Sequence, residues 1–387
     1  MTHFLKDILR QPEELRRTIE HLTGPAGAGR RALDAATAAI RSARHVYLTG
    51  IGSSWHAALN VGAMFHQRAH PVYLMDADEL LRFAAFPKDS AMIIISRSGK
   101  STEIVQLARK ARKAGVTVIG ITNAPDSPLA KEAQTAIVVP IAFDHAISVN
   151  TYTTLALAAG MLASSVVGQK AGSTATPVYP GSGSASRDSA SETAPARVPV
   201  LPNLANSLAN ALALTGRAIP GWQGRIEKSA WLAPHSTTYF LARGSSLGSA
   251  YESRLMWEEG VKTPATAMGT GSFRHGPQEI IAKEMRFGIW IDGAQMREQD
   301  LAVARDLRKL GARVMLIGQK LPEDAGDLVF QLPAISADWQ FLIDIIPAQL
   351  VAERLAGLSG VDCDTFRLSS FIVEDEGGLL PKEAEKK

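Results

Sequence analysis

The stretch Ala91–Glu103, which reads AMIIISRSGKSTE, joins an apolar run to a turn rich in serine. Its apolar part has three consecutive isoleucines at residues 93–95 and predicts a buried β-strand, because β-branched residues that end at a glycine-containing turn are typical of strands. The residues that follow, including Ile104 and Leu107, have the spacing of a helix. The serines therefore lie at a turn between a strand and a helix.

This serine-rich turn is suited to bind an anion. A helix N-terminus presents unpaired N–H groups and the positive end of the helix dipole, and hydroxyls and an arginine add further donors. A second turn of this kind, Gly52–Ser54, follows a predicted first strand at residues 45–50. In a doubly wound sheet both turns lie at the carboxyl edge of the strands, where ligands bind. Serines also cap helices, an alternative that stays open for one turn alone, but two turns, with Arg97 and Lys100 in one of them, favour an anion such as a phosphate.

The composition limits the classes of protein and partner. The chain has 387 residues, enough for two domains, and its net charge of +3 provides no field of one sign to attract nucleic acid or a membrane. Its single cysteine, Cys363, excludes an internal disulfide and a thiolate metal cluster. The N-terminus lacks the apolar core of a signal peptide, and the longest apolar stretch, Leu155–Val167, is shorter than the ~20 residues that span a bilayer. We expect a cytoplasmic protein without metal or cofactor, and a buried helix at Leu155–Val167.

Strands alternate with helices along most of the chain. The predicted strands are residues 45–50, 72–75, 91–96, 117–122 and 136–141 in the first half, and 237–242, 286–291, 313–318 and 328–332 in the second. Two helices are predicted before them, at residues 13–22, after Pro12, and at residues 30–43, and another at residues 247–260. Such alternation predicts an α/β fold in which helices cover both faces of parallel sheets. Residues 168–199 are rich in Gly, Ser, Ala and Pro and predict a flexible linker between two domains.

The two halves contain an internal repeat. Residues 47–54 (YLTGIGSS) align with residues 239–246 (YFLARGSS), with four identities in eight positions. Both segments fall at the first predicted strand and turn of their half, which makes a duplication the natural interpretation.

A carboxylate and an imidazole in the second half are candidates for proton transfer. They come from Glu258 and Glu259 and from the segment Phe273–Pro277, which reads FRHGP. Histidine titrates near neutral pH and glutamate can move a proton between carbons. Both residue types are more often structural in such positions, and the residues alone leave that alternative open.

Other motifs are absent or weak. No G-x-G-x-x-G follows the first strand, no Walker sequence occurs, and no G-x-S-x-G ends a strand, which argues against dinucleotide, nucleoside-triphosphate and serine-hydrolase sites. His66 and His70 stand four residues apart but lack the glutamate of a zinc protease, so a surface pair is expected.

Together, these residues resemble the sugar isomerase (SIS) domain family, and within it the isomerase half of glucosamine-6-phosphate synthase. The resemblance rests on the duplicated α/β halves, on the turns GIGSS and SRSGKST, on EEG followed by FRHGP, and on the opening segment FLKDILRQP. It implies two doubly wound, three-layer α/β/α SIS domains with parallel sheets, related by duplication. The implied division is an N-terminal helical segment (1–44), a first SIS domain (45–167), the linker (168–199), a second SIS domain (200–360) and a tail that closes the site (361–387).

The resemblance also implies roles for particular residues. A hexose or amino-hexose 6-phosphate, similar to fructose 6-phosphate or glucosamine 6-phosphate, would be bound by six serines and one arginine: Ser53, Ser54, Ser96, Arg97, Ser98, Ser101 and Ser148. Glu259 matches the family glutamate that moves a proton between C1 and C2, and His275 matches the histidine that opens the sugar ring. Because that histidine reaches the site of the neighbouring subunit in the family, a homodimer is implied.

Three features depart from the synthase. The tail lysine that forms a Schiff base in the family is matched here by Ser369, and Asn150 stands where the synthase has another lysine. The sequence starts at the isomerase half and its only cysteine is Cys363, so we expect no glutamine hydrolysis.

The sequence therefore predicts a metal-free aldose/ketose isomerase-type enzyme for a sugar phosphate, acting with gain or loss of an amine as in deaminases, deglycases and aminotransferases. Two alternatives stay open. One is a non-catalytic sugar-phosphate sensor or regulator, which the missing tail lysine favours. The other is a structural paralogue that pairs with a separate subunit.

Overall fold

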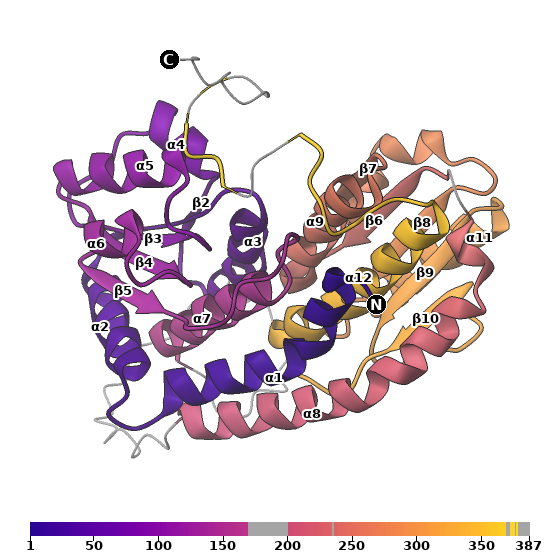
Figure 1. Cartoon of the computed structure of the whole chain (residues 1–387), viewed down its shortest axis with the longest axis horizontal. Coiled ribbons are helices and arrows are strands. Elements are labelled where there is room, and N and C mark those ends of the chain that lie inside the picture. Colours follow the sequence, from indigo (N-terminus) through magenta and orange to yellow (C-terminus); the bar gives the residue numbers. More distant parts are fainter. Residues whose placement is uncertain (169–199, 234–235, 369–371, 376, 378–387) are drawn as a thin grey trace, which may run out of the picture.

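The computed structural model describes residues 1–168, 200–233, 236–368, 372–375 and 377. In these residues two five-stranded parallel sheets lie beside each other, each flanked by helices (Figure 1). The first sheet has the order β2-β1-β3-β4-β5, from β1 (His45–Thr49), β2 (Tyr73–Leu74), β3 (Ser90–Ile95), β4 (Thr117–Thr122) and β5 (Thr135–Val138). The second has the order β7-β6-β8-β9-β10, from β6 (Thr238–Ala242), β7 (Ala265–Gly269), β8 (Arg286–Trp290), β9 (Arg313–Gly318) and β10 (Leu328–Gln331). The predicted fold class, two doubly wound α/β/α units, is confirmed.

The identical strand order supports the duplication that the sequence repeat predicts. In each sheet the first strand of the half pairs in parallel with the second and the third strands, so Tyr47 lies beside Met92 and Tyr239 lies beside Phe287. The repeated turns after β1 and β6 therefore occupy the same place in the two halves. This place is the switch point of a doubly wound sheet.

The prediction of four strands in the second half was wrong, because β7 was missed. Its sequence, ATAMG, lacks the large β-branched and aromatic residues that favour strands, and it pairs only with β6 at the edge of the sheet. A partly exposed edge strand needs no continuous apolar run, so the pattern contains little to detect.

The first helix was also predicted incorrectly. The expected start after Pro12 is replaced by one continuous helix, α1 (His3–Thr23), with this proline in its interior. Proline has no N–H to donate to the carbonyl of Ile8, but the side-chain amide of Gln11 donates to that oxygen instead, over 3.3 Å. The helix runs along α8 (Val200–Glu227) beneath both halves, and α2 (Ala28–Ser42) follows it (Figure 1).

The remaining helices flank the two sheets. In the first half they are α3 (Ser53–His66), α4 (Ala77–Phe83), α5 (Thr102–Lys113), α6 (Pro128–Glu132) and α7 (Asn150–Val167). In the second half they are α9 (Leu247–Met256), α10 (Thr270–Phe273), α11 (Arg297–Lys309) and α12 (Phe341–Leu358). The helix predicted at residues 247–260 changes to a π-helical turn at Trp257–Val261, and this turn carries Glu259. Insertion of a π-turn re-aims side chains and is frequent at functional sites.

The core joins the two halves. The helix α7 is buried along nearly its whole length, as predicted, and packs against α1, α2 and α3. One cluster of buried apolar side chains includes Leu48 and Ile119 of the first sheet together with Phe240 and Ile317 of the second. The two halves therefore meet at an interface that is part of one shared hydrophobic core.

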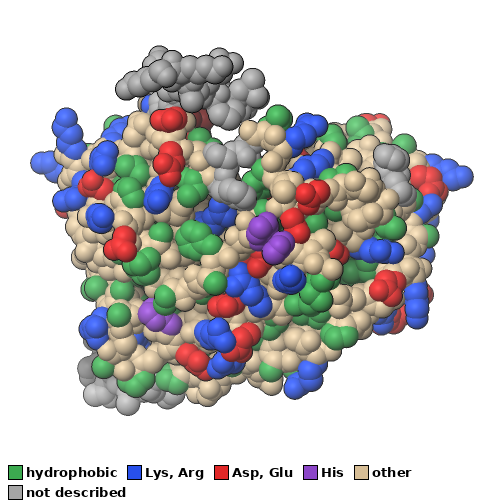
Figure 2. Space-filling view, viewed as in Figure 1, with side chains coloured by type: hydrophobic (Ala, Val, Ile, Leu, Met, Phe, Trp, Pro, Cys, Tyr) green, Lys and Arg blue, Asp and Glu red, His purple; other side chains and the backbone are tan. Residues whose placement is uncertain are grey.

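The described part of the chain has no helix that is both long enough and apolar enough to cross a bilayer. On the face drawn in Figure 2, acidic and basic side chains are interspersed rather than gathered by sign. The predicted linker, apart from Gly168, and the position of Ser369 lie outside the described residues.

Candidate active site

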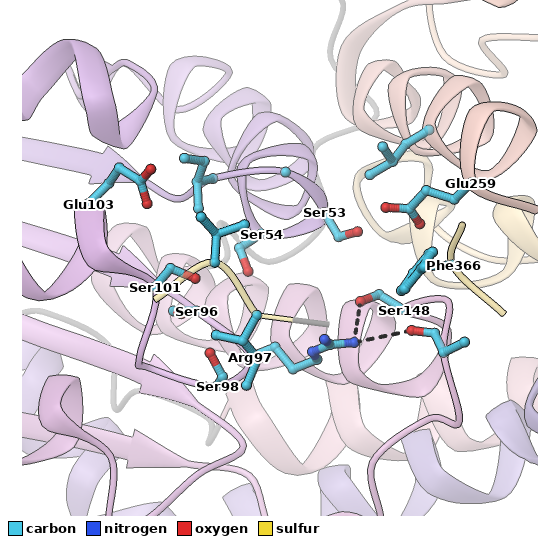
Figure 3. Close-up of a pocket in the computed structure, with 16 residues that line it drawn as sticks. Ser53, Ser54, Ser96, Arg97, Ser98, Ser101, Glu103, Ser148, Glu259 and Phe366 are labelled. Carbon is cyan, nitrogen blue, oxygen red and sulfur yellow. Dashed lines mark hydrogen bonds between the residues drawn. The ribbon is translucent and has the colours of Figure 1, made fainter. Parts of the chain in front are cut away.

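A cavity of about 280 Å³ lies between the two halves. It is lined by residues from the turns after β1 and β3, from the loop before α7, from the end of α9 and its π-helical turn, and from the tail. All seven predicted binding residues and the predicted base reach this cavity: Ser53, Ser54, Ser96, Arg97, Ser98, Ser101, Ser148 and Glu259 (Figure 3). His275 does not line it and instead lies exposed on the turn after α10.

The turn after β3 holds its serines in a fixed arrangement. The hydroxyl of Ser96 accepts a hydrogen bond from the N–H of Gly99 (3.1 Å), and the hydroxyl of Ser98 accepts one from the N–H of Lys100 (3.2 Å). Gly99 has a φ of +59°, and a Cβ at this position would lie 2.4 Å from the hydroxyl of Ser127, so the turn requires glycine. Because both hydroxyls accept from the turn, each still has a proton to donate to an anion.

The alternative that these serines cap helices is not what the structure shows. Ser101 precedes the first residue of α5, yet its side chain makes no capping hydrogen bond. The helix α3 begins after Gly52, whose φ is +55°, and Ser53 and Ser54 are already inside the helix. These hydroxyls are therefore not used for capping, and they project toward the cavity instead (Figure 3).

Arg97 is the cation of the cavity lining. Its guanidinium donates to the hydroxyl of Ser148 (3.1 Å) and to the carbonyl of Ala146 (3.4 Å), both on the loop before α7. Burial lowers the pKa of Arg97, while the charges of Asp144, Glu259 and Glu252 oppose this effect. These hydrogen bonds fix the position of the guanidinium, and burial leaves its charge poorly hydrated.

The buried carboxylate of Asp144 holds the loop that carries Ser148. Asp144 accepts from the backbone N–H groups of Val149 (2.9 Å) and Asn150 (3.0 Å), at the start of α7. The amide of Asn150 donates to Asp144 (2.8 Å) and to the carbonyl of Asp7 (2.9 Å). Asn150 therefore fastens this loop to α1 and does not line the cavity.

Glu259 is a cavity-lining carboxyl whose pKa lies far above its ordinary value of 4.5. Burial and the neighbouring charge of Glu252 raise its pKa to about 8, against the opposite effects of Arg97 and Lys262. A carboxyl with a pKa near neutral pH can both accept and return a proton at ordinary pH. Glu258, the other glutamate of the pair, is exposed and lies 3.7 Å from Arg254.

Two functional candidates, Glu252 and His56, were missed by the sequence reasoning. The carboxylate of Glu252 accepts from the hydroxyl of Ser53 (2.9 Å) and lies 2.7 Å from Nδ1 of His56. Both side chains are buried, with 1 % and 3 % of their surface exposed. Glu252 stands seven residues before Glu259, a spacing that places both on one face of a helix, and this was the only local signal available.

The corresponding turns of the second half do not form such a site. The hydroxyl of Ser245 donates to the carbonyl of Ala337 (2.8 Å), and that of Ser246 donates to the buried carboxylate of Asp344 (2.6 Å). After β8, the carboxylate of Asp292 accepts from three successive backbone N–H groups, those of residues 294–296. The protein's own carboxylates and one backbone carbonyl therefore occupy the donors that an anion would need.

Known proteins resemble this chain in sequence and in fold. Residues 39–165 match the family model described as SIS domain. The chain is 24% identical over 367 residues to a glutamine–fructose-6-phosphate aminotransferase (isomerizing) of Pyrobaculum aerophilum, a match that covers 94% of this chain and 56% of the relative. The chain thus spans little more than half the length of this curated relative.

Two solved structures have the same fold. The C-terminal domain of glucosamine-fructose-6-phosphate aminotransferase from Francisella tularensis has a TM-score of 0.78 at 21% identity, with 94% of this chain and 98% of that chain covered. A glucosamine-6-phosphate deaminase from Thermotoga maritima has a TM-score of 0.73 at 21% identity, with 96% and 99% covered. Residues 39–165 thus match the SIS domain model, in a chain that is similar over nearly its whole length to the isomerizing aminotransferases of fructose 6-phosphate.

Proposed function

We propose that this protein is an aldose/ketose isomerase-type enzyme for a hexose or amino-hexose 6-phosphate, and that it couples isomerisation to the loss or gain of an amine. The observation that carries the proposal is the shared cavity: hydroxyls that cap no helix and the half-buried Arg97 line it from the first half, and a carboxyl with a pKa of about 8 lines it from the second. The hydroxyls and the arginine can bind a phosphate, and the carboxyl can take a proton from a carbon atom of the sugar.

In this proposal the two groups that line the cavity have separate roles. Ser54, Ser96, Ser98 and Ser101 hold the phosphate, and the energy of that contact orients the reacting carbons. Glu259 takes the proton from C2 of the open-chain aldose and returns it to C1. If C2 carries an amine, this transfer gives an imine at C2, and water converts that imine to the ketose and ammonia.

Ring opening needs a second proton carrier. We assign it to His275 of a neighbouring subunit in a homodimer, because this side chain is exposed and does not line the cavity of its own chain. The buried pair of His56 and Glu252 is less suited to this step, since both oxygens of Glu252 already have partners.

The test is proton exchange at C2 in heavy water. The purified protein is incubated with glucosamine 6-phosphate, or with fructose 6-phosphate and ammonia, and the C2 position is followed by NMR. We expect deuterium to enter C2 with the wild-type protein and not with Glu259→Gln, which keeps the shape of the side chain. If the protein binds both sugar phosphates but exchanges no proton at C2, the proposed enzymatic function is wrong.

One observation favours a second function, that of a sugar-phosphate sensor. Among the described residues that line the cavity none is a lysine, so an imine with the protein would have to come from outside this set. A sensor should bind the same ligands, and Glu259→Gln should leave it with an unchanged response because it has no catalysis to lose.

A further inference from the structure

Lys262 makes contacts that link the predicted base to the tail. It follows the π-helical turn with a φ of +58°, a left-handed conformation that is uncommon for a side-chain-bearing residue. Its ammonium donates to the carbonyl of Glu259 and, over 2.8 Å, to the carbonyl of Thr365. It also lies 5.8 Å from the centre of the Phe366 ring.

The same tail segment is fixed at a second point. The carboxylate of Asp364 accepts from the backbone N–H groups of His3 (2.7 Å) and Phe4 (2.8 Å), in the first turn of α1. Asp362 in turn accepts from the N–H of Asp364 and from the hydroxyl of Thr365, each over 2.8 Å. Residues 362–366 are therefore held between α1 on one side and Lys262 on the other.

The consequence concerns Phe366. This side chain lines the same cavity as Glu259, and Figure 3 shows its ring on the side of the cavity where the carboxyl of Glu259 projects. An aromatic ring in this position displaces water from the carboxyl. We propose that Lys262 is a positioning residue, which anchors the tail so that Phe366 shields Glu259 from solvent. This proposal deepens the proposed function, and it rests on Glu259 as the base.

Lys262 acts on Glu259 in two opposite ways, which makes the proposal testable. Its positive charge, like that of Arg97, lowers the pKa of Glu259, whereas burial and the charges of Glu252 and Glu258 raise it. Loss of the charge alone would therefore raise the pKa of Glu259. Loss of the anchor would let water reach the carboxyl and would lower it.

The experiment replaces Lys262 and follows Glu259 directly. Glutamate is labelled with ¹³C at the carboxyl, the Glu259 signal is assigned by its absence in Glu259→Gln, and its titration is recorded by NMR. In Lys262→Met we expect the midpoint to fall by about 1 pH unit as water enters. In Lys262→Arg, which keeps the charge and the donors, we expect the wild-type midpoint. Lys228→Met, at an exposed lysine remote from this cavity, is the matched control.

Phe366→Ala supplies an independent variant, because it removes the shield without a change of charge. The proposal requires its midpoint to fall in the same direction as that of Lys262→Met. A midpoint that rises or stays constant in Lys262→Met overturns the anchoring role, even if Phe366→Ala lowers it. If Lys262→Met does not fold, then a lowered midpoint in Lys262→Gln supports the proposal, and a raised or unchanged one overturns it.

The titration needs no turnover. The positioning role of Lys262 and the proposed enzymatic function can therefore fail independently. If the midpoints move as expected while no sugar phosphate exchanges its C2 proton, then the positioning role stands and the proposed function is wrong. If exchange occurs, its pH profile should shift with the NMR midpoint in each variant, a correlation that a purely structural lysine would not produce.

Discussion

The imidazole of His56 and the carboxylate of Glu252 lie 2.7 Å apart, although they stand on helices α3 and α9 of different halves. The other oxygen of Glu252 accepts from Ser53, a residue of the cavity lining. One buried interaction therefore joins the two halves at the site itself. Its position suggests that stability and site geometry depend on the same contact.

Replacement of His56 by alanine should destabilise the protein strongly. The change leaves a carboxylate buried without its main partner, and removal of one member of a buried pair costs about 3–5 kcal/mol. Denaturant unfolding measures the loss. Glu258→Ala is the control, because its partner Arg254 is at 3.7 Å and partly exposed, and such pairs contribute ~1 kcal/mol or less. If both variants lose the same free energy of unfolding, then the buried pair contributes no more to stability than the exposed one.

Stability should depend on pH through Glu259. Its pKa rises from 4.5 to about 8 on folding, so the folded state favours the protonated carboxyl. The stabilisation is complete below the unfolded value and is lost as the pH rises through the folded value. The free energy of unfolding of the wild-type protein, relative to that of Glu259→Gln, should therefore decrease between pH 4.5 and about 8. Parallel pH profiles for the two proteins would contradict the raised pKa.

Ser54 and Ser246 occupy equivalent positions of the repeat but should respond differently to alanine. Ser54→Ala should weaken the binding of a hexose 6-phosphate by about 10- to 100-fold, since a hydrogen bond to a charged group contributes ~1.5–3 kcal/mol. Binding of the unphosphorylated hexose should change little. Ser246→Ala should lower stability, because its hydroxyl bonds Asp344, without a change in affinity. Calorimetric titration and thermal unfolding distinguish these outcomes, and an affinity loss in Ser246→Ala would place a ligand in the second half.

Subunit mixing tests the role proposed for His275. Glu259→Gln and His275→Ala should each abolish proton exchange when pure. Mixed after dissociation, they should recover about a quarter of the wild-type rate, because half of the random dimers are mixed and each of these has one intact site. No recovery, with mixed dimers present by native mass spectrometry, would mean that each chain supplies its own histidine.

The parts of the fold that were predictable are those with a strong local pattern. Buried parallel strands such as β3 and β4 consist mainly of apolar residues, and the serine turn after β3 marks both the end of a strand and the start of a helix. The edge strand β7 has neither feature. The helix through Pro12 could not be predicted, because its missing hydrogen bond is replaced by the side chain of Gln11, which a rule about backbone groups does not include.

The site was predictable to the extent that its residues are in motifs. The serines and Glu259 belong to turns and to a helix end that can be recognised alone, whereas Glu252 acquires its role from His56, 196 residues away. The raised pKa of Glu259 was not predictable either, since it arises from burial and from charges that only folding brings together. Sequence motifs thus indicate which groups are present, and packing determines their protonation.

The carboxylates of Asp292 and Asp344 have a consequence for the energetics of the two halves. In the second half these side chains satisfy the donors of the repeated turns, so the anion is part of the chain and its effect is independent of any solute. In the first half, an anion at Ser54, the equivalent of Ser246, would come from solution, so its contribution would depend on the concentration of that anion. If the first half binds a phosphate as proposed, only its turns would make the stability of the protein depend on the concentration of a ligand.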